Sequence, residues 1–189
     1  MMSLDLSKLN GLLWAIWAAY WIYSARNTKR DIKKQDQGGR LAHLAALIVG
    51  FSLIFAVDRF SSFALANFSS ISLQIVGCLV TLAGQVFCVW ARHHLGQNWS
   101  GTVTLKENHA LVRSGPYKIS RHPIYTGFLF SVIGSALTSG TGIAFLGLML
   151  ITASYLRKIR IEEAVLSKQF GEDYSQFQAD VPMLFPKIY

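Results

Sequence analysis

Apolar runs alternate with polar, mostly basic segments along this chain, and the alternation predicts its architecture. Five runs have the composition of membrane helices: residues 9–24, 41–57, 71–91, 124–138 and 143–156. A full span needs about 20 such residues, so the last two runs are short. Because only residues 139–142 separate these two runs, we expect them to form a helical hairpin. The pattern predicts an all-α integral membrane protein with about five transmembrane helices.

Single residues within the runs refine this picture. Trp14, Trp17 and Trp21 in the first run are typical of a helix near the bilayer interface, and no cleavable signal pattern precedes them, so we expect a retained helix. Gly77 and Gly84 are seven residues apart in the third run. They share one helical face, where another helix can approach closely.

The polar segments have their own structure. Residues 92–122 are too long for a tight turn between helices, which makes them a candidate functional segment. Residues 157–170 have helical periodicity, and Gly171 is placed to end that helix. We expect residues 183–187 to be an extended segment that packs back on the body of the protein.

Composition and charge support a membrane protein and assign its sides. Hydrophobic residues make up 52% of the 189 residues and charged residues only 15%, unlike an average soluble domain. The basic residues behind the net charge of +8 flank apolar runs, so this charge does not favour nucleic-acid binding. Of 18 Lys and Arg residues, 16 lie in 26–40, 92–121 and 157–187. The positive-inside rule makes these segments cytoplasmic and the N-terminus external, most simply in a prokaryotic plasma membrane.

Several kinds of site are not favoured by residue spacing. The adjacent His93 and His94 point in different directions on a helix, so no zinc or other metal site is predicted. The two cysteines, Cys78 and Cys88, lie in one helical run and cannot bridge each other. The chain contains no Gly-x-Ser-x-Gly motif, which argues against a common class of hydrolase.

The segment from Gly115 to Gly127 is the candidate centre of the chemistry. Pro123 suits the first turn of a helix, so Arg121 and His122 should lie where that helix begins, a place that attracts anions. The alternative is a plain surface loop before a helix. Polar and aromatic groups on the same predicted side are the groups that a zwitterionic, cationic cofactor needs: Trp99, His109, Arg113, Tyr117, Arg121, His122, Tyr125, Glu162 and Glu163. Glu162 and Glu163 could instead form local helix pairs with Lys158 and Arg160.

Residues 92–189 carry ordered motifs of a known family. They read LGQNWS at 95–100, HALV at 109–112, SGPY at 114–117, RHPIYTG at 121–127, and the Glu162, Glu163 pair before FGEDY at 170–174. This arrangement resembles the isoprenylcysteine carboxyl methyltransferase family, integral membrane enzymes that use S-adenosyl-L-methionine and are related to phospholipid methyltransferases. The N-terminal half resembles the family only in its apolar spans.

The resemblance implies a function for each region. A membrane region of three helices, 1–91, precedes a catalytic region, 92–189, within a single domain. The catalytic region comprises a cytoplasmic cofactor-binding loop, 92–122, the hairpin 123–156, and a C-terminal helix and tail, 157–189. The implied reaction is methyl transfer to a lipophilic acceptor, most simply the carboxylate of an isoprenylcysteine-like substrate, leaving S-adenosyl-L-homocysteine.

The resemblance also implies roles for single residues. Those implied to bind the cofactor are His109, Ala110, Leu111, Val112, Tyr117, His122, Pro123, Ile124, Tyr125 and Glu162. Arg121 and Glu163 are expected near the methyl-transfer centre, as catalytic residues. Relatives that methylate prenylcysteine use an arginine ahead of the glutamate pair for the acceptor carboxylate. The matching region reads RKIR at 157–160 here, and the residue expected to bind the acceptor is Lys158.

Two alternatives stay open at this point. Membrane sterol reductases share a His-Pro-x-Tyr pattern and bind NADPH, so a reductase of that type is the second candidate. A membrane scaffold or transport component without enzymatic activity is the third. The expected partners are a lipophilic or prenylated acceptor and membrane lipids, with neither nucleic acid nor an obligatory protein partner indicated.

Overall fold

The computed structural model describes residues 5–26, 31–33, 37–55, 66–99, 105, 106 and 111–185. Its α-helices are α1 (Leu6–Ser24), α2 (Gln37–Phe55), α3 (Ile71–Leu95), α4 (Pro123–Ser139), α5 (Gly142–Phe170) and α6 (Glu172–Asp180). Two 3-10 helices, η3 (Gly96–Asn98) and η4 (Gly115–Lys118), lie between α3 and α4. Two short strands, β1 (Asp31–Lys33) and β2 (Leu105–Lys106), pair antiparallel. The prediction of a helical architecture is confirmed, with this small strand pair added.

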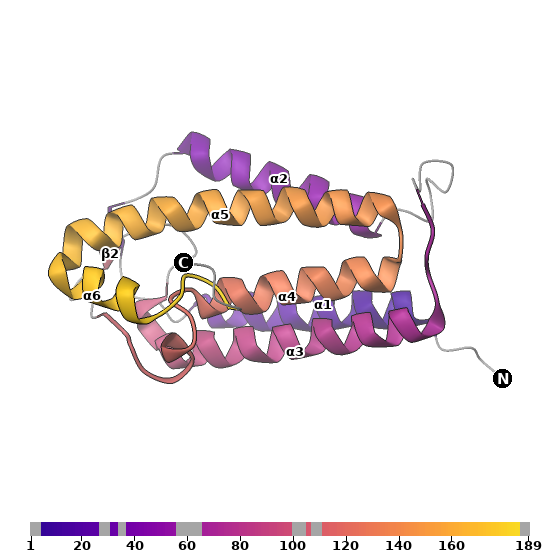
Figure 1. Cartoon of the computed structure of the whole chain (residues 1–189), viewed down its shortest axis with the longest axis horizontal. Coiled ribbons are helices and arrows are strands. Elements are labelled where there is room, and N and C mark those ends of the chain that lie inside the picture. The colour runs from indigo at the N-terminus through magenta and orange to yellow at the C-terminus, as the bar shows by residue number, and fades with distance from the viewer. Residues whose placement is uncertain are drawn as a thin grey trace.

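The long helices form two groups that run along the length of the molecule (Figure 1). In one group α3 packs on α4, and α1 packs against both. In the other group α2 packs on α5. The turn between α4 and α5 joins the two groups at one end. Side chains of both groups meet between them, and this is where the candidate site lies.

Glycines allow the helices of each group to approach closely. A Cβ atom on Gly84 of α3 would lie 2.5 Å from the carbonyl oxygen of Gly127 in α4. Gly77 faces Gly134 in the same way, so the predicted close contact at Gly77 and Gly84 is confirmed. In the second group, a Cβ atom on Gly147 would lie 2.5 Å from the carbonyl oxygen of Gly50. Small residues at helix contacts are the usual means of packing in a membrane.

The ends of α4 and α5 follow from their sequences. Pro123 begins α4, and Gly140 ends it in the left-handed conformation, at a φ of 64°. The hydroxyl of Thr141 then accepts a hydrogen bond from the backbone N–H of Ala144 and caps α5. The expected hairpin is therefore present. Its second arm does not stop at residue 156, however, and continues as one helix to Phe170, before Gly171. No Gly or Pro interrupts 148–170, so only the polarity of the side chains changes at Arg157.

By length and composition, three helices of the described residues could cross a membrane. They are Gly38–Phe55, Ile71–Asn98 and Gly142–Phe170. The apolar α4, with 17 residues, is shorter than these three. The number of five spans stays a prediction, whereas the integral membrane character of the fold is supported.

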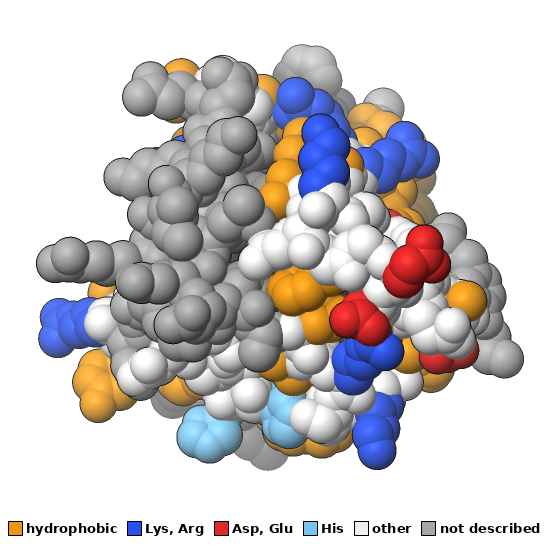
Figure 2. All heavy atoms as spheres, turned by 90° about the vertical axis from the view of Figure 1, so that its left-hand side faces the viewer, with side chains coloured by type: hydrophobic (Ala, Val, Ile, Leu, Met, Phe, Trp, Pro, Cys, Tyr) orange, Lys and Arg blue, Asp and Glu red, His pale blue; other side chains and the backbone are white. Residues whose placement is uncertain are grey.

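The connections gather at two ends of the molecule. Pairing of β1 with β2 brings the segments before α2 and after α3 together, at the end where α6 lies. At the other end, residue Asn67 pairs with Thr141, next to the turn that joins α4 to α5. The segments predicted to be cytoplasmic thus share one end in the described residues. Figure 2 looks onto that end, and Lys and Arg side chains lie at several places on it.

The last described residues pack back on the start of α4, as the sequence predicts. The backbone N–H of Arg121 donates to the carbonyl of Pro182 at 2.9 Å, and that of His122 donates to Met183 at 3.3 Å. Met183 and Leu184 are buried. The amides of Arg121 and His122, which precede α4, are therefore engaged by the C-terminal segment, and anion binding at the first turn of α4 stays a prediction.

Candidate active site

The polar end of α5 places two neighbouring glutamates against the start of α4. The Glu162 carboxylate accepts a hydrogen bond of 2.8 Å from the hydroxyl of Tyr125. Glu163 turns to a different set of partners: the Arg121 Nε donates to its Oε1 at 2.8 Å, and the Nε2 of His122 lies 3.2 Å from the same oxygen. Gln178 of α6 donates to the other oxygen at 3.3 Å. Glu163 therefore contacts α4 and α6 rather than making the local helix pair that the sequence left open.

The buried side chain of Arg121 hydrogen-bonds to several segments. Its side chain is 4% exposed, and besides Glu163 it donates to the carbonyl oxygens of Gln178, at 3.0 Å, and Val181. A buried cation needs such partners, because an unpaired charge in a protein interior is costly. Arg121, two residues before α4, thus connects the start of α4 to α5, α6 and the residue that follows α6.

The surroundings of these groups set their protonation. Glu163 lies beyond the apolar part of α5, among polar groups. Burial alone would raise the pKa of its carboxyl, but the hydrogen bonds from His122 and Arg121 outweigh burial and lower this pKa to about 2. Burial raises the pKa of the Tyr117 and Tyr174 phenols far above the usual value, so both stay neutral. Glu163 is consequently a fixed negative charge with fixed partners.

Aromatic rings surround the Glu162 side of the site. His122 stacks on Tyr125 with 5.6 Å between ring centres, and the Tyr155 ring meets Tyr125 edge-on at 5.2 Å. The Lys158 Nζ lies 5.3 Å from the centre of the Tyr125 ring. A carboxylate beside aromatic faces is a suitable environment for an organic cation.

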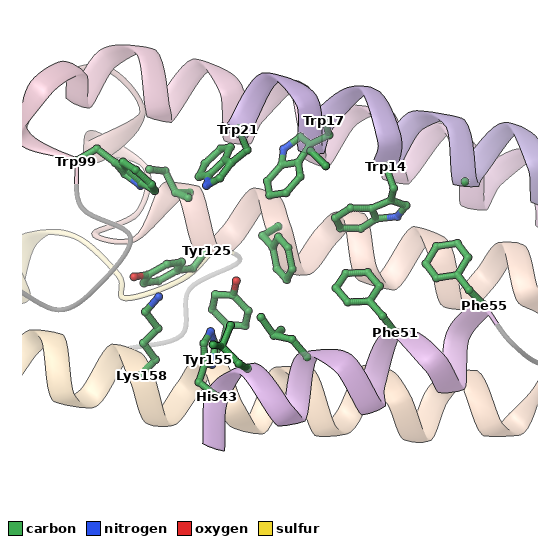
Figure 3. Close-up of a pocket in the computed structure, with 16 residues that line it drawn as sticks. Trp14, Trp17, Trp21, His43, Phe51, Phe55, Trp99, Tyr125, Tyr155 and Lys158 are labelled. Atoms are coloured by element: carbon green, nitrogen blue, oxygen red, sulfur yellow. The ribbon is translucent and has the colours of Figure 1, made fainter. Parts of the chain in front are cut away.

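A cavity of about 760 Å³ opens beside this cluster, between the two groups of helices (Figure 3). Tyr125 and Lys158 lie at one end of it, near Trp99, and Phe55 lies toward the other (Figure 3). Most of its wall is aromatic or aliphatic. The lining residues are Gly11, Trp14, Trp17, Ala18, Trp21, His43, Leu44, Leu47, Phe51, Phe55, Trp99, Ile124, Tyr125, Phe128, Tyr155 and Lys158.

The structure brings most of the predicted cofactor residues to this end of the molecule. Ile124 and Tyr125 line the cavity, and Pro123 and His122 are buried directly before them. Leu111 and Val112 pack with Tyr117 in a second apolar cluster that includes α6 residues. His109 and Ala110 lie outside the described residues.

The other predicted residues divide between the cavity and its support. Lys158 lines the cavity, as its predicted role in acceptor binding requires. Arg121 and Glu163 do not line it and pair with each other instead. They lie outside the layer of residues that lines the cavity, and Glu163 directly follows Glu162 in α5.

Two features of the cavity were not predicted from the sequence as parts of a site. One wall is formed by Trp14, Trp17 and Trp21. Their spacing of three and four residues places them on one helical face, and this signal was available in the sequence. His43 lines the opposite side, with its Nδ1 2.7 Å from the hydroxyl of Ser154. A lone ionisable residue in an apolar run is a functional candidate by itself, and this signal could have identified it.

Comparisons with known proteins all point to one family. Residues 75–168 match the model of the "Isoprenylcysteine carboxyl methyltransferase (ICMT) family". The "Protein-S-isoprenylcysteine O-methyltransferase" of Schizosaccharomyces pombe is 33% identical over 141 residues, which cover 73% of this chain and 59% of that protein. The protein of the same name from Saccharomyces cerevisiae is 31% identical over 117 residues, covering 60% of this chain and 49% of that one. The chain thus spans about half the length of the curated relatives it matches.

The fold has a counterpart among solved structures. That of the "eukaryotic intramembrane Ras methyltransferase ICMT" superposes with a TM-score of 0.54 at 24% sequence identity. The match covers 83% of this chain and 55% of that one, so it reaches the N-terminal helices as well. The matched residues 75–168 include α4, Tyr125, Lys158 and both glutamates. Through this segment, the chain belongs to the isoprenylcysteine carboxyl methyltransferase family.

Proposed function

We propose that this protein transfers a methyl group from S-adenosyl-L-methionine to the carboxylate of a lipophilic, isoprenylcysteine-like acceptor. The observation that carries the proposal is a juxtaposition. Glu162, a carboxylate with aromatic neighbours, bonds to Tyr125, and Tyr125 lines the polar end of an apolar cavity together with Lys158. A charged donor and a lipid acceptor need a polar site and an apolar cavity that adjoin each other.

The Glu162 side has the chemistry that the donor requires. Its carboxylate can pair with an ammonium group, and the rings of Tyr125 and Tyr117 suit a sulfonium. His122, stacked on Tyr125, keeps that ring in place. When bound, S-adenosyl-L-methionine supplies an activated methyl group, which passes to a carboxylate oxygen to give a methyl ester and S-adenosyl-L-homocysteine.

The cavity side fits the acceptor. Its apolar wall can bury a hydrocarbon chain, and each buried CH₂ contributes about 0.8 kcal/mol. At the polar end, the Lys158 ammonium can pair with the acceptor carboxylate. A carboxylate acceptor carries no proton that must leave, so this arrangement works by positioning and by excluding water.

Arg121 and Glu163 have a positioning role in this proposal. They hold the start of α4, the polar end of α5 and the segment after α6 in one arrangement. Because Glu162 and Tyr125 belong to two of these elements, the Arg121–Glu163 pair sets the distance between them. This differs from the direct catalytic role that the resemblance suggested.

The placement in the membrane is also part of the proposal. The end that carries Glu162, η4 and α6 faces the cytoplasm, and the N-terminus faces outward. The cavity then lies within the bilayer, and Ala18 and Leu44, two of its lining residues, are exposed on the surface of the protein. A lipid acceptor can enter from the bilayer, whereas the water-soluble donor arrives from the cytoplasm.

Isothermal titration of the purified protein in detergent tests the donor site. We expect saturable binding of S-adenosyl-L-homocysteine by the wild type. Glu162→Gln should weaken it roughly 10-fold or more, since a charge-assisted hydrogen bond contributes about 1.5–3 kcal/mol. Glu172→Gln, which changes an exposed glutamate of α6, should bind like the wild type. Heat from NADPH, with none from S-adenosyl-L-homocysteine, would instead support the reductase.

A further inference from the structure

We propose that Gly11 in α1, at the far end of the acceptor cavity, leaves room for the tip of the lipid chain and thereby sets the longest chain that the site accepts. The proposal rests on the methyltransferase function proposed above. It assigns a role in specificity to a residue outside the family match, which begins at residue 75.

The first argument is the direction of α1 along the cavity. Gly11, Trp14, Ala18 and Trp21 all line it, at spacings that place them on one helical face. Trp21 contacts Trp99 edge-on at 5.6 Å, which puts Trp21 at the end where Trp99 and Lys158 lie (Figure 3). Gly11 is ten residues earlier, about 15 Å along the helix axis. Because the hydrocarbon layer is about 30 Å thick, the cavity reaches roughly the middle of the bilayer.

The second argument is the space at Gly11. A Cβ atom built there meets nothing within 4 Å. Gly50 of α2 is different, because its Cβ would collide with the Ile151 side chain, so that glycine serves helix packing. Gly11 therefore leaves room that no neighbouring side chain fills.

The third argument is the rigidity of the wall around this room. The indole N–H of Trp14 donates to the Ser135 hydroxyl at 2.8 Å, and its ring meets Phe51 edge-on at 4.9 Å. Phe55 stacks on Phe51 in turn. These rings cannot easily move aside, so a larger residue at position 11 would shorten the cavity rather than reshape it.

The residues at the far end of the cavity also determine which kind of lipid chain fits there. Of the described residues that line the far end, Gly11, Trp14, Phe51 and Phe55, Trp14 alone carries a polar side-chain group, an indole N–H that is already hydrogen-bonded. A polar group at the end of the lipid would remain unpaired there, at a cost of about 1–3 kcal/mol. The site thus takes a prenyl-type chain that is apolar to its tip.

Acceptors of graded length test the proposal. N-acetyl-cysteines carrying geranyl, farnesyl or geranylgeranyl groups are assayed for methyl ester formation with the wild type, Gly11→Leu and Gly11→Phe. We expect both variants to lower the ratio of kcat/KM for the longest acceptor to that for the shortest by about 10-fold or more, mainly through KM, since a few methylenes are worth this much. Ala18→Leu, about 10 Å nearer the polar end, should disfavour shorter chains as well.

Leu12→Phe is the matched control. It places the same side chain as Gly11→Phe at the neighbouring position of α1, where Leu12 is exposed and does not line the cavity. It should leave the length profile of the wild type unchanged. If Gly11→Phe does not fold, Gly11→Leu and Ala18→Leu carry the same comparison.

Other results would overturn the proposal. An equal loss for all three acceptors in the Gly11 variants, or an equal shift in Leu12→Phe, would contradict a role of Gly11 in chain length while leaving the methyltransferase function intact. Absence of methyl transfer by the wild type to every acceptor would overturn both.

Discussion

Neighbouring residues can have separate roles when they point in different directions from a helix. Glu162 and Glu163 are about 100° apart around α5. Glu162 bonds to Tyr125 beside the cavity, whereas Glu163 is enclosed by Arg121, His122 and Gln178. The first is therefore available to a ligand, and the second stabilises the fold.

The acid dependence of stability should report the role of Glu163. Its pKa of about 2 in the folded protein lies below the ordinary value of 4.5, so ionised Glu163 stabilises the folded state above about pH 4.5. This contribution, about 3 kcal/mol at most, is lost as the pH falls toward 2. We expect the unfolding temperature of the wild type to fall more steeply between pH 5 and 3 than that of Glu163→Gln. Parallel curves for the two proteins would contradict this role.

At the scale of single elements, glycines decide which helices pair. Gly84 and Gly127 bring α3 and α4 into backbone contact, and hydroxyl groups add hydrogen bonds across the same surface. The Thr81 hydroxyl donates to the carbonyl of Ser131 at 3.2 Å, and the Ser131 hydroxyl donates back to Thr81 at 3.2 Å. This contact fixes α4, and with it Tyr125, relative to α3.

Gly84→Ala should therefore destabilise the protein by about 1–3 kcal/mol, since the added methyl group would lie 2.5 Å from a backbone oxygen. Gly11→Ala is the matched control: it makes the same change where nothing lies within 4 Å. Alanine's higher helix propensity should then stabilise α1 by up to about 1 kcal/mol. Thermal unfolding in detergent measures both, and equal effects of the two substitutions would contradict the close contact.

At the scale of the whole molecule, two groups of helices enclose the cavity, and the charged connecting segments distinguish one end of the molecule from the other. The described segments rich in Lys and Arg lie at the end with β1, β2 and α6. Only Lys8 of the described basic residues belongs to the other end, in the first turns of α1. The proposed orientation therefore gives the donor access from the cytoplasm.

Labelling of introduced cysteines tests this orientation. Lys118→Cys places a thiol at an exposed position of η4, and Lys8→Cys places one at the opposite end, where the Lys8 side chain is 84% exposed. Cys78 and Cys88 are buried and should react slowly. In intact cells an impermeant maleimide should label position 8, and in inside-out vesicles position 118. The reverse pattern would show that the positive-inside assignment is wrong.

The sequence by itself determined the long helices α1 to α5, most of their ends, the close contact at Gly77 and Gly84, and the set of residues at the start of α4, but it did not predict α6. These depend on local properties: apolar length, Pro and Gly positions, and a motif that lies within one segment. It did not show that α5 continues past residue 156, because a change of polarity resembles the end of a span.

Only the tertiary structure decided which glutamate bonds to a residue that lines the cavity, that Arg121 bonds to the end of α6, and that Gly11 and Lys158 share one cavity. The physical reason is that a cavity is the space left between packed elements. Its walls come from α1, α2, α4 and α5, and its shape depends on how closely each glycine contact lets those helices approach.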